Sequence, residues 1–96
     1  MTKAGLVAHV AALMETSELA AERSVNAVLE AICNALESGE SVKLVGFGVF
    51  EVAERAERVA RNPKTNEEIR LPPVSIPVFR PGSGLKARVQ KEVDNA

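Results

Sequence analysis

The 96-residue chain contains one cysteine, one histidine and three phenylalanines, and it has neither tryptophan nor tyrosine. The single cysteine, Cys33, excludes an intrachain disulfide and a cysteine-cluster metal site. The single histidine, His9, has no second ligand or carboxylate partner at a useful spacing. The sequence also lacks a nucleophile beside a base, a Walker-type loop and a GxGxxG motif. We therefore expect a protein that is not an enzyme and that binds no cofactor, metal or small-molecule substrate.

Long apolar runs are missing as well. The first ten residues, MTKAGLVAHV, are interrupted by Lys3 and His9, whereas a membrane span needs roughly 20 apolar residues. We expect a cytoplasmic protein without membrane contact, folded as one domain over residues 1–96.

The apolar neighbours of Cys33 predict that its side chain is buried.

Charge is small in total but unevenly distributed along the chain. The net charge is −1, which is not typical of a nucleic-acid-binding domain. Residues 1–40 hold two basic and six acidic residues, for a net charge of −4, whereas residues 41–96 hold ten basic and seven acidic residues, for +3. The chain is therefore polarised, and this distribution of charge says more about binding partners than the net charge does.

Hydrophobic periodicity predicts an α+β fold. Apolar residues at helical spacing predict a first helix to Met14 and a second helix from the Ser17 cap to about residue 38. The pattern then alternates with a period of two on both sides of GFG and again over residues 74–78, before a short C-terminal helix. We expect a helical base over 1–40, a three-stranded sheet within 41–81 and a helix over 82–96.

Residues 53–73 hold few large apolar side chains and predict an arm that leaves the body of the protein. Pro63 and Asn66 have the turn chemistry to connect two extended flanks. Nine residue steps at about 3.3 Å give a reach of roughly 30 Å. The remaining residues can build only a marginal single core, and the second helix has a wide apolar face. We therefore expect an obligate dimer, and favour a homodimer over a heterodimer.

The arm has the chemistry of a DNA-binding ribbon. Guanidinium groups suit phosphate oxygens and the minor groove, which is about 6 Å wide and admits a thin ribbon. At the tip of such a ribbon, the apolar ring of Pro63 can act as a wedge between base pairs. The arm's cations are Arg55, Arg58, Arg61, Lys64 and Arg70.

Three segments of the chain resemble the bacterial HU and IHF histone-like DNA-binding proteins, and the resemblance covers essentially the whole chain. The segments are GFGVFEV at 46–52, RNPKTNEEI at 61–69 and FRPGSGLKARV at 79–89. The resemblance implies an intertwined dimer with two β-ribbon arms that bend duplex DNA by proline intercalation, a mechanism for which HU and IHF are known examples. It also implies a nucleoid-associated protein with little sequence preference.

The resemblance assigns roles by position. Pro63 is the expected intercalating residue, and Asn62 is expected to join the arm's cations in contacting DNA. Expected contacts from the body to flanking phosphates are Lys3, Arg80 and Lys86. The sequence departs from the family where it has Ala53 in place of a common arginine and Asn66 in place of a common glycine.

Four alternatives remain open from the sequence. Pro63 is also a suitable residue for an ordinary exposed turn, and alternating charges such as ERAER are typical of cross-strand ion pairs on a solvated ribbon. The chain as a whole is compatible with a structural dimer or protein-interaction module of low DNA affinity, or with a sequence-preferring IHF-like subunit. Phe47, Phe50 and Phe79 are expected in the core.

Overall fold

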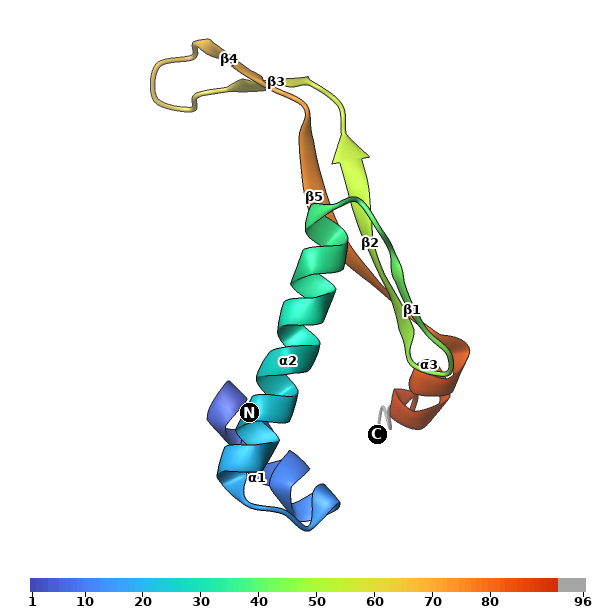
Figure 1. Cartoon of the computed structure of the whole chain (residues 1–96). Coiled ribbons are helices and arrows are strands. Elements are labelled where there is room, and N and C mark those ends of the chain that lie inside the picture. The colour runs from blue at the N-terminus through green and yellow to red at the C-terminus, as the bar shows by residue number, and fades with distance from the viewer. Residues whose placement is uncertain (92–96) are drawn as a thin grey trace, which may run out of the picture.

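The structure is a computed structural model that describes residues 1–91. Two helices come first, followed by five strands and a short helix (Figure 1). Their bounds are α1 Lys3–Met14, α2 Glu18–Glu37, β1 Val42–Leu44, β2 Gly48–Arg55, β3 Arg58–Arg61, β4 Glu68–Leu71, β5 Val74–Pro81 and α3 Ser83–Val89. The predicted α+β class and order of helices and sheet are confirmed. The predicted C-terminal helix ends at Val89 instead of continuing, and residues 92–96 lie outside the described part.

The N-terminal helices begin at side-chain caps and share a small core. The Ser17 hydroxyl accepts a hydrogen bond from the Ala20 N–H at 3.2 Å, as expected of an N-cap. The core of the helix pair consists of Val7, Ala11, Ala21 and Val25, with Ala21 fully buried. None of the helices in residues 1–91 combines the length and the apolar character that a membrane crossing requires.

The sheet has strand order β1-β2-β5, and both pairings are antiparallel. Gly48 faces Pro81 across the β2–β5 ladder. A Cβ atom at Gly48 would lie 2.6 Å from the Arg80 carbonyl oxygen and 2.7 Å from the Phe79 ring, so only glycine fits this position. Phe79 stacks against Phe47 and Phe50 with ring centroids 5.5 and 4.7 Å apart.

A single chain leaves much of its apolar surface uncovered. Its radius of gyration is 19.3 Å, whereas a compact chain of this length has about 12–13 Å. Phe47 and Phe79 are 45% and 38% exposed, so the prediction that they are core residues is not met within one chain. Cys33 was expected to be buried and is exposed, because it lies beside an open hollow where α2 meets the sheet. The apolar faces of α2 and the sheet therefore lack a cover within one protomer.

Candidate nucleic-acid interface

The arm consists of two ribbons separated by a break. The β2–β5 ladder ends at the pair Arg55–Val74, and the β3–β4 ladder resumes at Arg58–Leu71. Pro72 and Pro73 lie on one side of this break, and proline has no N–H with which to continue a ladder. Figure 1 shows that the β3–β4 ribbon turns away from the direction of β2 and β5. The missing N–H groups of these two prolines thus interrupt the strand pairing along the arm.

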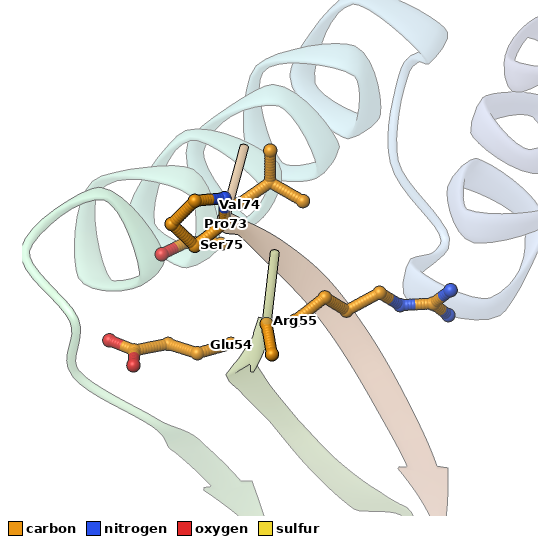
Figure 2. Close-up of a pocket in the computed structure, with 6 residues that line it drawn as sticks. Glu54, Arg55, Pro73, Val74 and Ser75 are labelled. Carbon is orange, nitrogen blue, oxygen red and sulfur yellow. The ribbon is translucent and has the colours of Figure 1, made fainter. Parts of the chain in front are cut away.

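The base of the arm places charges on opposite sides of the ribbon. Figure 2 shows the side chains of Glu54 and Arg55 pointing away from each other at the end of β2. With Ala56 they line an open hollow, whose other side comes from residues 73–75. Arg55, one of the expected DNA contacts, is exposed and accessible there.

The tip is an ordered turn that presents Pro63 to solvent. The Asn66 N–H donates to the Asn62 carbonyl at 2.8 Å, and the Asn62 N–H donates to the Glu67 carbonyl at 3.0 Å. The Asn62 side-chain oxygen also accepts a hydrogen bond from the Lys64 N–H at 2.9 Å. Asn66 has a φ of 60°, a conformation that asparagine tolerates better than most residues. Asn66 therefore takes part in the turn as expected, and the exposed ring of Pro63 lies on a turn held by hydrogen bonds.

Two of the arm's cations already have partners. The Arg61 guanidinium donates to the Asn66 side-chain oxygen at 3.3 Å and lies 3.8 Å from a Glu68 carboxylate oxygen. The Arg70 guanidinium lies 3.7 Å from a Glu57 carboxylate oxygen. Within residues 1–91, the other three arm cations, Arg55, Arg58 and Lys64, form no ion pair. The prediction of cross-strand pairs thus holds for part of the arm.

The expected body contacts lie on separate elements. Lys3 is the first residue of α1, Arg80 is near the end of β5 and Lys86 is on α3. Arg80 forms an ion pair with Glu51 of β2. In Figure 1, α1 and α3 both lie far from the β3–β4 ribbon. One chain therefore does not bring its body cations and arm cations together into a single patch.

Close backbone contact fixes the start of α3. The Gly82 N–H donates to the Phe47 carbonyl at 2.9 Å. A Cβ atom at Gly84 would lie 2.6 Å from the Gly46 carbonyl oxygen. Glycine at 84 thus lets α3 approach the turn between β1 and β2, and this sets the position of Lys86.

Sequence reasoning missed the acceptors that hold the arginines. Glu51 and the side-chain oxygen of Asn66 were not considered as partners, because charge alone does not say which residues face each other. The strand register would have identified Glu51, since residues on the same face of neighbouring strands lie within reach, whereas Asn66 lies in the tip turn between β3 and β4. The described residues contain no group of three or more histidine, cysteine or carboxylate side chains that could hold a metal ion.

A helix pair, a three-stranded sheet and a basic ribbon with an exposed proline define the class of architectural DNA-binding proteins. The family model described as "Bacterial DNA-binding protein" matches residues 1–90. The chain belongs to this family, the HU proteins, and the resemblance seen in the sequence is confirmed. HU proteins are architectural and not enzymes, as the missing catalytic motifs led us to expect.

Individual relatives are similar over nearly their whole length. HU of Clostridium pasteurianum is 44% identical over 91 residues, covering 95% of this chain and 100% of that protein. HU-1 of Halalkalibacterium halodurans is 48% identical over 89 residues, covering 93% and 99%. The Anabaena HU–DNA cocrystal structure has a TM-score of 0.88 and 42% identity, covering 93% of this chain and 97% of that one.

Proposed function

We propose that two copies of this chain form an obligate homodimer that binds and bends duplex DNA. Dimerisation would cover the apolar faces of α2 and the sheet, where large side chains such as Leu29 and Phe79 are 44% and 38% exposed in one chain. Contiguous exposed apolar surface of this kind typically marks a protein interface. A two-fold axis would then project both arms from one body.

The arms are proposed to enter the minor groove of duplex DNA. Arg55, Arg58, Arg61, Asn62, Lys64 and Arg70 would contact the groove and its phosphates. Lys3, Arg80 and Lys86 would contact flanking phosphates as the DNA bends around the body. The solved Anabaena relative, which this chain resembles at a TM-score of 0.88, is an HU–DNA complex. Because such contacts go mainly to the DNA backbone, we propose binding with little base readout.

The geometry of Pro63 is the observation that carries the bending mechanism. Its apolar ring is exposed at the end of a thin ribbon, and the turn beneath it is held by hydrogen bonds from Asn62 and Asn66. An apolar side chain on a rigid tip can insert between base steps and stabilise a kink, a mechanism known in this family. The proposed role in the cell is compaction of the nucleoid in the bacterial cytoplasm.

The energetic cost of bending DNA allows a test of whether the protein bends DNA when it binds. Smooth bending of a short duplex costs on the order of 1–6 kcal/mol, and a gap in one strand removes much of this cost. We expect the wild-type dimer to bind gapped duplex more tightly than intact duplex in gel-shift titrations at equal salt. Equal affinities across a salt series would contradict bending as part of binding.

A second candidate function is a structural or protein-interaction dimer with little DNA affinity. It is favoured by the net charge of −1 and by the carboxylate partners of Arg61, Arg70 and Arg80. Titration of labelled duplex at about 50 and 200 mM salt separates the two functions, because phosphate binding weakens steeply between them. No measurable binding at the lower salt would favour this second candidate.

A further inference from the structure

We propose that Glu51, Glu57 and Glu68 are built-in competitors of DNA phosphate. In the free protein these carboxylates form ion pairs with the guanidinium groups of Arg80, Arg70 and Arg61, respectively. When DNA binds, a phosphate must replace the carboxylate as the partner of each arginine. The inference rests on the proposed function. It states that specific ion pairs, and not the net charge alone, lower the affinity of this chain for DNA.

The strand register places two of the three pairs, and the third lies at the end of a ladder. Arg61 and Glu68 are direct partners in the β3–β4 ladder. Arg70 faces Val59 in this ladder, and Glu57 lies just before β3, outside the ladder, with a carboxylate oxygen 3.7 Å from the Arg70 guanidinium. Such cross-strand positions lie within reach of long side chains. The ladder therefore fixes the Arg61–Glu68 pair directly, and it holds Arg70 beside the segment that carries Glu57.

Glu51 and Arg80 repeat this arrangement in the body. Arg80 faces Val49 in the β2–β5 ladder, and Glu51 lies two residues beyond Val49 on the same face. The side chain of Arg80 is 71% exposed and that of Glu51 only 33%. The carboxylate is therefore the more fixed partner, and the guanidinium remains open to an incoming phosphate.

The tip adds a second acceptor for Arg61. The side-chain oxygen of Asn66 accepts a hydrogen bond from this guanidinium at 3.3 Å, beside the Glu68 carboxylate at 3.8 Å. Arg61, next to the proposed wedge, is thus held by two groups from the return side of the arm.

Paired arginines deliver less net charge to DNA than unpaired ones. When an arginine reaches a phosphate while its glutamate stays close, the site carries no net positive charge. Such a site releases fewer of the counterions condensed on DNA, so affinity depends less steeply on salt. Arg55, Arg58 and Lys64, which form no ion pair within residues 1–91, would supply most of the salt-dependent attraction.

Two double variants with equal charge separate specific pairing from net charge. Glu57→Gln with Glu68→Gln removes two paired carboxylates of the arm. Glu54→Gln with Glu67→Gln removes two arm carboxylates that form no ion pair within residues 1–91. All four side chains are exposed, so we expect both variants to fold as the wild type does, which thermal unfolding monitored by circular dichroism verifies.

Each dimer is titrated with the same labelled duplex across a salt series. Exposed ion pairs are worth little individually, so we expect the paired double variant to bind about two- to fivefold more tightly per freed arginine. Its slope of log K against log salt should steepen by up to about 0.9 per freed cation. The unpaired double variant should show clearly smaller changes. Glu51→Gln is an independent variant in the body, with the same expected direction.

Equal changes in the two double variants would overturn the inference and leave the proposed function standing, because net charge alone would explain them. No change in either variant or in Glu51→Gln would also overturn it. A wild-type dimer that binds no duplex at low salt would instead contradict the proposed function, and the inference with it.

Discussion

The helical base and the arm of this protein are stabilised in different ways. Residues 1–40 carry a net charge of −4 and contain the buried apolar residues of the chain's small core. Residues 53–73 carry +1, and none of them is buried. Burial therefore defines the base, whereas ladder hydrogen bonds and turn chemistry define the arm. Substitutions should separate stability in one region from DNA bending in the other.

The largest effect is expected at the aromatic cluster that a second chain would cover. Phe79→Ala removes the ring that contacts both Phe47 and Phe50. Loss of a buried phenylalanine costs about 3–5 kcal/mol, so the dimer should unfold at much lower urea concentration and dissociate in sedimentation experiments. The control is Val59→Ala in the arm, which should change stability by less than about 0.5 kcal/mol. Equal losses from both variants would refute the division between the packed body, which includes the sheet, and the arm.

An intermediate effect is expected at the cap of α2. Ser17→Ala removes the hydroxyl that accepts the Ala20 N–H and should cost about 1 kcal/mol. Urea unfolding measures this loss, and Ser17→Asp should restore most of it because aspartate is an equally good cap. The bend angle of bound DNA should stay unchanged in both variants. A changed bend angle would mean that the two regions are coupled.

The smallest effect on stability, with a large effect on DNA, is expected at the tip. Pro63→Ala should leave the free energy of unfolding within about 0.5 kcal/mol of the wild type. The DNA bend, measured by energy transfer between labels at the duplex ends, should decrease because the wedge is gone. Thr65→Ser is a matched change in the same turn and should preserve the bend. An unaltered bend in the Pro63 variant would exclude the wedge.

Much of this architecture follows from local sequence rules. The Ser17 cap, the change of period after the second helix and the turn at Asn66 are properties of a few neighbouring residues, and these expectations were correct. Burial was harder to predict, because Cys33 and Phe79 depend on which surfaces come together. A single chain leaves both exposed, and apolar periodicity alone does not distinguish a core within one chain from an interface between two.

The acceptors that pair with the arginines also could not be predicted from the sequence. Charges on the arm were visible, but pairing depends on register, and a shift of one residue would move every side chain to the other face. The break between the two ribbons was missed for a related reason. Pro72 and Pro73 were included in one continuous arm, although their missing N–H groups prevent a continuous ladder.

The break has a consequence for how the arm forms. No ladder pair joins the β3–β4 ribbon to β2 and β5 across residues 56–57 and 72–73, so closing the tip turn does not lengthen the body sheet. The tip should behave as a separate cooperative unit with low local stability. Amide protons of Val59 and Ala60 should exchange with solvent much faster than those of Val49 and Phe50, even while the body remains fully folded.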